Sequence, residues 1–229
     1  MADIVIVFPL FPRLTQLDFT GPHQFFAGLD GVRAVAASVD GAPIVADGGL
    51  VFSELPALAA VVRCDVLCVP GGHGCTDAMQ DPRYMAEIRR LAGLARYVTS
   101  VCTGSLILGA AGLLRGKRAT SHWAWREMLT LFGAIPVNDR VVRDGNVFTG
   151  GGVTAGIDFA LTLAGELVGP EAAQARQLGL EYAPAPPFDA GSPETAPAAI
   201  LALARDRMAT TLPARRAAVE LVAARQALA

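Results

Sequence analysis

The sequence predicts an α/β fold, in which a mostly parallel central sheet is flanked by helices as in a flavodoxin-like sandwich. Short aliphatic runs alternate with longer stretches of helical periodicity, which is typical of parallel strands covered on both faces. A length of 229 residues suits one domain of this class. At residues 97–113 a β-type run meets a cysteine and turns at once into a helix of small residues, which indicates a strand–turn–helix unit.

Strands are expected where aliphatic runs are short and end at turn residues. Such runs lie at Ile4–Phe8, Val32–Ser38, Asp65–Val69 and Tyr97–Val101. Two hairpins are predicted, at residues 44–52 and 140–149, around Asp47-Gly48-Gly49 and Asp144-Gly145-Asn146.

Helices are expected between the strands. The clearest is residues 81–95, because Asp81 is a good N-cap and Pro82 suits the first turn. Apolar spacing predicts further helices at residues 21–29, 123–132 and 153–168.

The chain changes character after residue 180. Residues 181–197 contain five prolines and are predicted to form an extended arm, which cannot bury its own Tyr182 and Phe188. Helices are expected again at residues 200–208 and 213–228. We therefore expect residues 1–180 to form the α/β core, and residues 181–229 to belong to the same domain and to contact a second subunit.

Composition excludes several classes of function. The net charge of −2 comes without a basic patch, so no nucleic-acid partner is expected. The longest uncharged stretch, residues 97–114, contains serines, threonines and glycines, which suits a buried strand and helix better than a membrane span. The apolar N-terminal run ends at Pro9 and contains no signal-peptide pattern, so we expect a cytoplasmic protein without a membrane partner.

The four cysteines do not have the spacing of a metal site, so no metal is expected. Cys64 and Cys68 lie in or beside an apolar strand and are predicted to be inert, whereas Cys75 lies in a glycine-rich loop and is expected to be partly exposed. Cys102 is different, because the strand before it and the small residues after it have the pattern of a nucleophile elbow. Such a turn places the sulfur at a helix N-terminus, where a thiolate is favoured. The alternative is a buried structural cysteine.

A cysteine nucleophile needs an acid–base partner. Asp18 follows the first strand in apolar surroundings, so it is either a helix cap or a desolvated acid with a raised pKa; Thr20 is nearer to the expected helix start. His23 and His122 are interpreted first as packed side chains, although His122 is also a candidate for the substrate pocket. The carboxyl ends of parallel strands share one edge of a sheet, so Asp18 and Cys102 can converge there.

Two glycine-rich segments are predicted to complete this site. Backbone N–H groups of Gly71 and Gly72 are not shielded by a Cβ atom and could stabilise negative charge on a bound intermediate. The second segment, residues 150–156, includes Val153 and would either line the pocket beside the sulfur or let a helix pack closely.

Several of these segments resemble the ThiJ/PfpI superfamily, and within it the isocyanide hydratase branch. The similar segments are Phe8–Pro22, Val69–Gly72, Ser100–Leu106, Gly116–Trp123, Gly150–Phe159 and Glu181–Phe188. The resemblance implies a homodimer that needs no cofactor and converts isocyanides to N-formamides. It also implies that Cys102 is the nucleophile, that Asp18 is the acid and base, and that Thr103 supports them.

These observations lead us to expect a hydro-lyase acting through a Cys102 thioimidate, with Asp18 first giving and then taking a proton. The alternatives are a glyoxalase-like or small hydrolase activity of the same cysteine, and a non-enzymatic redox or stress sensor. A ligand-binding core detached from a transcription regulator is a further alternative, although no helix-turn-helix segment follows the core.

Overall fold

A six-stranded sheet forms the centre of the computed structural model, which describes residues 3–227. Neighbouring strands are parallel except for the pair β10–β9 at one edge. In spatial order the strands are β2 (Val32–Ala37), β1 (Ile4–Pro9), β5 (Val66–Val69), β6 (Tyr97–Val101), β10 (Val147–Gly150) and β9 (Val141–Asp144). The predicted α/β class and mostly parallel sheet are thus confirmed.

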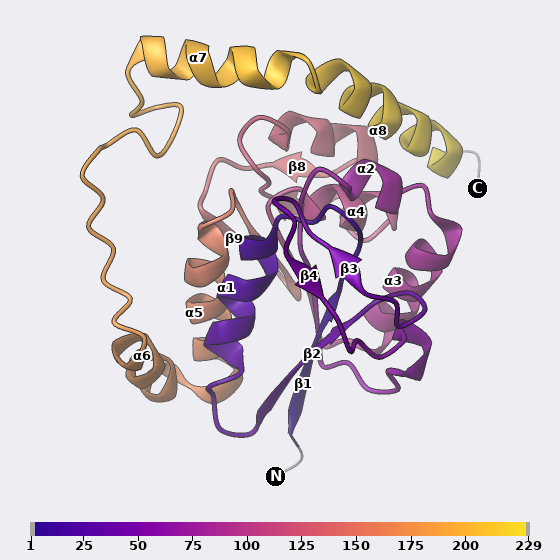
Figure 1. Cartoon of the computed structure of the whole chain (residues 1–229), viewed down its shortest axis with the longest axis vertical. Helices are drawn as coiled ribbons and strands as arrows, with labels where there is room; N and C mark the ends of the chain where they lie inside the picture. The colour runs from indigo at the N-terminus through magenta and orange to yellow at the C-terminus, as the bar shows by residue number, and fades with distance from the viewer. Residues whose placement is uncertain (1–2, 228–229) are drawn as a thin grey trace.

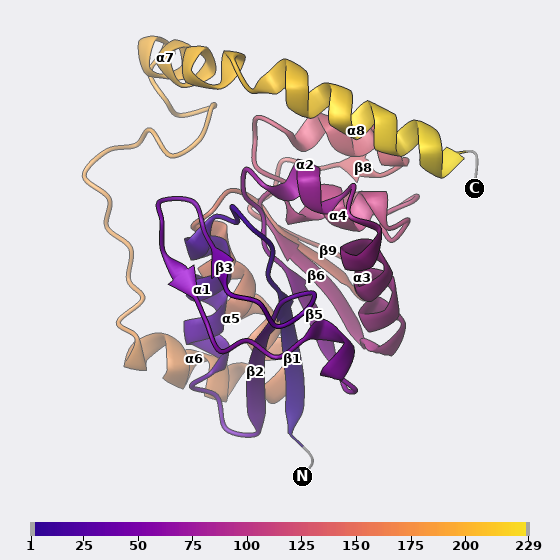
Figure 2. The same ribbon diagram turned by 45° about the vertical axis from the view of Figure 1, so that its right-hand side comes forward.

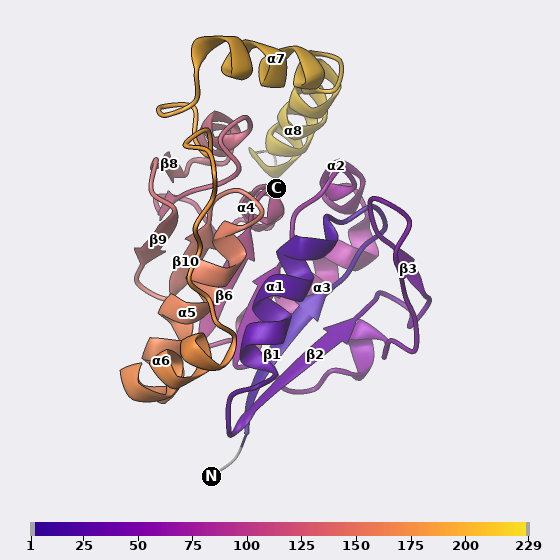
Figure 3. The same cartoon turned by 60° about the vertical axis from the view of Figure 1, so that its left-hand side comes forward.

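Helices cover both faces of the sheet (Figures 1 and 3). One layer contains α1 (Gln16–Phe26), α5 (Ala155–Val168) and α6 (Pro170–Gly179), with α1 and α6 packed on α5. The other layer contains α2 (Cys75–Ala78), α3 (Pro82–Leu94) and α4 (Gly104–Ala110), as Figure 2 shows. The 3₁₀-helix η2 (Arg126–Phe132) packs on α4. Smaller elements are the pairs β3 (Ile44–Val45)–β4 (Val51–Phe52) and β7 (Arg118–Ala119)–β8 (Ile135–Pro136), and η1 (Leu58–Ala60).

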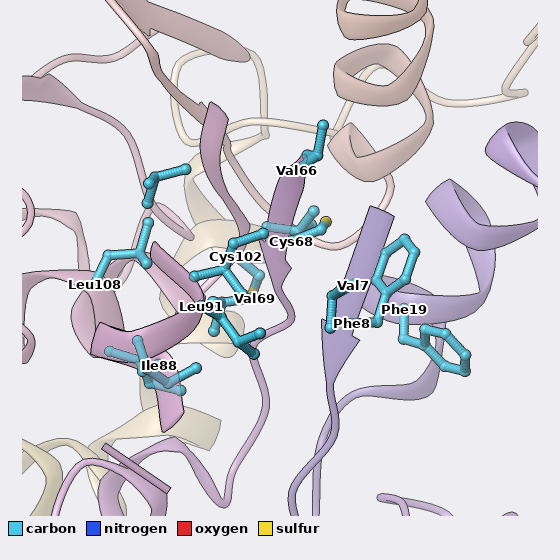
Figure 4. Packing of buried hydrophobic residues seen from close by; sticks show 14 of the residues in the cluster. Val7, Phe8, Phe19, Val66, Cys68, Val69, Ile88, Leu91, Cys102 and Leu108 are labelled. Carbon is cyan, nitrogen blue, oxygen red and sulfur yellow. The ribbon is translucent and has the colours of Figure 1, made fainter. Parts of the chain in front are cut away.

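The core lies between these layers. Every residue of β5 and β6 is buried, as expected for central strands with helices on both faces. Figure 4 shows Phe8 of β1 beside Phe19 of α1, whose rings pack edge to face with centroids 5.3 Å apart. The two predicted hairpins are present, as the antiparallel pairs β3–β4 and β9–β10.

The predicted start of α3 is confirmed, whereas that of α1 was wrong. Asp81 caps α3 as expected, because its carboxylate accepts hydrogen bonds from the N–H groups of Arg83 and Tyr84. The prediction for the first helix was wrong: α1 begins at Gln16 rather than at residue 21, and Pro22 lies inside it. Because the preceding turns and the packing on α5 hold the helix, it tolerates the missing Pro22 N–H. Asp18 therefore lies in the first turn of α1 rather than before the helix.

Other differences have local causes. Residues 126–132 form a 3₁₀-helix rather than an α-helix over 123–132, and it ends at Gly133, whose φ is 72°. The helix α6 was not predicted; it is separated from α5 by Gly169 at φ 91° and starts at Pro170. Cys75 is fully buried because it begins α2, which corrects the expectation of partial exposure.

After α6 the chain runs away from the α/β core, and its last helix packs on the core again. Residues 181–197 form no helix or strand and lead from α6 to α7 (Ala198–Ala209) at the opposite end of the molecule (Figure 1). Tyr182 is half-buried and donates a hydrogen bond to Asp158 Oδ1 at 2.9 Å, so the expectation that the chain leaves this ring uncovered was wrong. Phe188 is 79% exposed. The last helix, α8 (Leu212–Ala227), packs on α2, α4 and η2; Leu228, the predicted end of this helix, lies outside the described residues.

Residues 3–227 contain no helix that is both long and apolar enough to cross a membrane. The division of the chain at residue 180 stays a prediction.

Candidate active site

Cys102 occupies the turn between β6 and α4 with a φ of 56°, a left-handed conformation that is uncommon for a residue with a side chain. Its N–H group donates to the carbonyl oxygens of Gly150 and Gly151, at 3.0 and 2.8 Å. The hydroxyls of Ser105 and Ser121 donate to its carbonyl oxygen, each at 3.0 Å. These bonds hold the strained backbone in place, as in a nucleophile elbow.

The small residues around the turn allow close backbone contacts. A Cβ atom on Gly104 would lie 2.2 Å from the carbonyl oxygen of Val69, and one on Gly71 would lie 2.5 Å from the N atom of Thr103. Neither position accepts a side chain without movement of the backbone. The elbow thus brings the ends of β5 and β6 together.

Asp18 is buried completely beside this turn. Its Oδ2 atom accepts a hydrogen bond from the N–H group of Gly71 at 3.0 Å. Within residues 3–227 its Oδ1 atom has no hydrogen-bond partner at normal distance, and the Cys102 thiol is close enough to act on the carboxyl group. The structure thus brings together Asp18 and Cys102, which are 84 positions apart in the sequence.

Burial controls the protonation of this pair. It raises the pKa of Asp18 to about 7, although hydrogen bonds from Gly71 and Cys102 act in the opposite direction. Burial, and then the charge of Asp18, raise the pKa of Cys102 well above its usual value. The thiolate expected from the helix N-terminus is therefore not the resting form, because desolvation outweighs the nearby N–H group of Thr103.

The backbone N–H groups of Gly71 and Gly72 already donate hydrogen bonds within the protein. The N–H group of Gly71 donates to Asp18, and that of Gly72 donates to Thr103 Oγ1 at 3.0 Å. Neither N–H group is free to bind a charged intermediate, which corrects the predicted role. The loop instead fixes the Asp18 carboxylate and the Thr103 hydroxyl, which also donates to the Gly72 carbonyl at 3.3 Å.

A cavity of about 280 Å³ opens onto the sulfur. Five of the predicted residues line it, namely Cys102, Thr103, Gly72, His122 and Val153. Other lining residues were not predicted. They include Trp125 together with Arg207, Met208, Thr211 and Arg215 from the C-terminal helices and the turn between them. No local signal marks these residues as part of a site, since only the return of α8 to the core brings them there.

His122 and His23 have different surroundings. His122 accepts a hydrogen bond at Nδ1 from the N–H group of Ala124 at 3.3 Å, which leaves its proton on Nε2. Burial, and then the charge of Arg215, lower the pKa of His122 to about 4, so it is neutral at pH 7. His23 packs against the rings of Phe8 and Phe19, as predicted for a packed side chain. Residues 3–227 contain no group of three His, Cys, Asp or Glu side chains able to hold a metal ion.

The raised pKa of Asp18 predicts an effect on stability. The pKa of the Asp18 carboxyl group is about 7 in the folded protein, against an ordinary value of 3.8. Between these values the folded state binds more protons than the unfolded state, so the protein loses stability as the pH rises from about 4 to 7. A shift of this size corresponds to about 4 kcal/mol at most. His122 acts in the opposite direction at similar pH, but its effect cancels between variants that both retain it.

We therefore expect Asp18→Asn to gain stability relative to the wild type as the pH rises from 4 to 8. Urea unfolding of both proteins at each pH measures this difference. A difference that is independent of pH would show that Asp18 titrates normally in the fold.

Comparison with known proteins supports the fold and the family. The model of the DJ-1/PfpI family matches residues 5–166. The chain is 56% identical over 220 residues to the isonitrile hydratase of Pseudomonas putida, covering 96% of each protein. It is also similar to the crystal structure of a ThiJ/PfpI family protein from Pseudomonas syringae, with a TM-score of 0.91 and 40% identity over 97% of this chain and 91% of that one.

Drosophila melanogaster DJ-1beta is a more distant structural relative, with a TM-score of 0.71 and 25% identity over 80% of this chain and 100% of that one. The family match covers more than half of the chain and includes both Asp18 and Cys102. The expected superfamily is therefore confirmed, and the chain belongs to the DJ-1/PfpI family.

Proposed function

We propose that this protein hydrates isocyanides to N-formamides, with Cys102 as nucleophile and Asp18 as general acid and base. The observation that carries the proposal is the buried Asp18–Cys102 pair, in which a carboxyl group with a pKa of about 7 lies beside a thiol that faces a cavity. The extensive identity to an isonitrile hydratase supports the same assignment.

The chemistry of an isocyanide explains why such a pair is needed. The terminal carbon is electron-rich, so a thiolate adds to it poorly until the carbon is protonated. In the first step the thiol proton passes to Asp18, Asp18 delivers it to the isocyanide carbon, and the Cys102 sulfur forms a bond to that carbon. The product is a thioimidate, R–N=CH–S–Cys102, and Asp18 is left ionised.

Water completes the reaction. The ionised Asp18 takes a proton from water as the oxygen attacks the thioimidate carbon, and this proton then goes to the substrate nitrogen. The C–S bond breaks, the hydroxyl proton returns to Asp18, and the formamide R–NH–CHO leaves. All atoms of the isocyanide and of one water molecule appear in the product, and the pair holds one proton again.

Thr103 and the cavity residues have supporting roles in this proposal. The hydrogen bonds between Thr103 and Gly72 fix the loop that orients Asp18 through the N–H group of Gly71. His122 and Val153 line the substrate side of the cavity. With its proton on Nε2, His122 can donate a hydrogen bond to a bound substrate.

Formamide production from a simple aryl or alkyl isocyanide tests the proposal directly. Infrared spectroscopy follows loss of the isocyanide, and chromatography identifies the formamide. Conversion of methylglyoxal to lactate without any formamide would instead favour the glyoxalase-like alternative. Oxidation of Cys102 by peroxide, again without formamide, would favour the redox sensor.

We further propose that the protein is a homodimer in which the arm and α7 contact the second subunit. No residue of α7 is buried, and Ile200, Leu203 and Phe188 are 48, 49 and 79% exposed. A partner that covers these apolar side chains removes the cost of their contact with water. All four cysteines are free, which suits a reducing compartment, so we place the protein in the cytoplasm.

Light scattering at micromolar concentration is expected to give about twice the chain mass of 23.8 kDa. Leu203→Asp places a charge among the exposed apolar residues of α7 and is expected to shift the population toward monomer. Leu178→Asp is the control, since Leu178 is 81% exposed but belongs to α6. A fully active monomer of the wild type at this concentration would refute the proposal.

A further inference from the structure

Arg215 is a buried cation in the wall of the Cys102 cavity. It is 7% exposed, and its Nη2 atom donates to the carbonyl oxygens of Gly72 and His73, at 3.3 and 3.4 Å. Its guanidinium lies over the ring of Trp125, 4.4 Å from the centroid. Among the ion pairs that residues 3–227 form, none includes Arg215.

The ionisable side chains that line this cavity are basic apart from the Cys102 thiol, although His122 is neutral at pH 7. Besides the Cys102 thiol they are His73, His122, Arg207 and Arg215, whereas no aspartate or glutamate is among the lining residues in the described part of the chain. Asp18 is next to the Cys102 thiol but is not a lining residue, and the Asp47 carboxylate lies 2.6 Å from His73 Nδ1. The cavity thus presents two arginines to whatever occupies it.

A buried guanidinium without a carboxylate partner is costly, because it loses its hydration and gains only weak compensation from carbonyl groups and an aromatic ring. A bound anion would offset this cost, and the planar fork of arginine matches a carboxylate. Arg215 lowers the pKa of His122 and of Cys75, whereas burial and Asp18 dominate at Cys102. Of these two groups, His122 lines the same cavity as Arg215.

We propose that the preferred substrates are isocyanides whose R group carries a carboxylate, and that Arg215 is the specificity-determining residue that binds it. This inference rests on the proposed hydration. The isocyanide carbon lies at Cys102 and the carboxylate lies against the wall formed by α8, with the exposed Arg207 of α7 adding positive charge at the opening. A cavity of about 280 Å³ accommodates a small substrate of this kind.

The first test compares isocyanoacetate with its methyl ester, which share the reacting group but differ in charge. For the wild type kcat/KM is expected to be at least about tenfold higher for the acid, as for a charge-assisted hydrogen bond. Added salt should reduce this preference. Arg215→Met is expected to bring the ratio close to one, and Arg215→Lys to restore part of it. Equal losses for both substrates in Arg215→Met would mean a purely structural role and would overturn the inference.

Arg216→Met is the matched control. Arg216 is the next residue of α8, is paired with Glu220 at 2.8 Å, and is not among the residues that line the cavity, so its loss should leave the acid-to-ester ratio unchanged. If Arg215→Met does not fold, the acid-to-ester ratio of kcat/KM for the wild type, together with its salt dependence, still tests the inference. A wild-type preference for the ester would contradict the inference.

A binding experiment separates this inference from the proposed function. Calorimetry on Cys102→Ala compares N-formylglycine, the expected product, with its methyl ester. Tighter binding of the acid by about tenfold, lost in Cys102→Ala/Arg215→Met, supports the anion site even if no isocyanide is converted, and in that case only the proposed hydration fails. Equal binding of acid and ester would overturn the anion site whatever the turnover.

Discussion

Replacing Cys102 by alanine is expected to abolish formamide production while leaving the fold intact. The proposed thioimidate requires the sulfur, and Cys102 supplies the only thiol among the described residues that line the cavity. Removal of a nucleophile of this kind typically costs at least about 10⁴-fold in turnover. Single-turnover assays with excess enzyme measure the residual rate, and circular dichroism verifies the fold.

Cys68→Ala is the control for this experiment. Cys68 is fully buried in β5, and burial raises the pKa of its thiol to about 12, so it is inert at neutral pH. Its replacement should lower stability and leave turnover per folded molecule unchanged. During turnover by the wild type, acid-quenched mass spectrometry should find the peptide bearing Cys102 heavier by one isocyanide, because the addition loses no atoms. Rapid turnover by folded Cys102→Ala would rule out the nucleophile assignment.

The fold was readable from the sequence where local patterns and tertiary structure agree. The strand at residues 97–101 was predicted with its observed bounds, because a short β-branched run that ends at a tight turn has few alternatives. The start of α1 was missed because Gly21 and Pro22 are normally helix-end residues, whereas packing on α5 keeps them inside a helix. Tertiary contacts, absent from any sequence window, decided this boundary.

The candidate site divides in the same way. The elbow at Cys102 has a local signature, and the order of parallel strands suffices to bring Asp18 to the same edge of the sheet. Arg215 has no such signature, since it belongs to an alanine- and arginine-rich helix whose place over the cavity depends on long-range packing.

The prediction of a Cys102 thiolate was wrong because the cost of burying a charge exceeds the stabilisation that a helix N-terminus provides. A helix N-terminus stabilises a charge by at most about 2 kcal/mol. Loss of hydration in a buried site costs several kcal/mol, and Cys102 is 5% exposed with a carboxyl group beside it. The sequence identifies the helix N-terminus but not the depth of burial, so it reveals only the favourable part of the balance.

The second large effect is expected for Asp18→Asn. Asparagine has nearly the same shape and can still accept the hydrogen bond from Gly71 at its side-chain oxygen, but it cannot receive the thiol proton or pass it to carbon. The chemical step should therefore slow by at least about 10²-fold. Stopped-flow measurement of isocyanide loss gives this rate, and Asp158→Asn, a substitution at a partly exposed acid on α5, is the control.

The pH profile distinguishes a lost proton carrier from a disturbed site. The active pair holds one proton in total, so kcat/KM of the wild type should rise as the pH increases through about 7, where the pair loses the first of its two protons. The pH profile of kcat/KM for Asp18→Asn should lack this inflection. A near-normal kcat in this variant would mean that another group carries the proton. His122, neutral and in the same cavity, would then be the next residue to replace, because its Nδ1 accepts from Ala124 and its proton is therefore on Nε2.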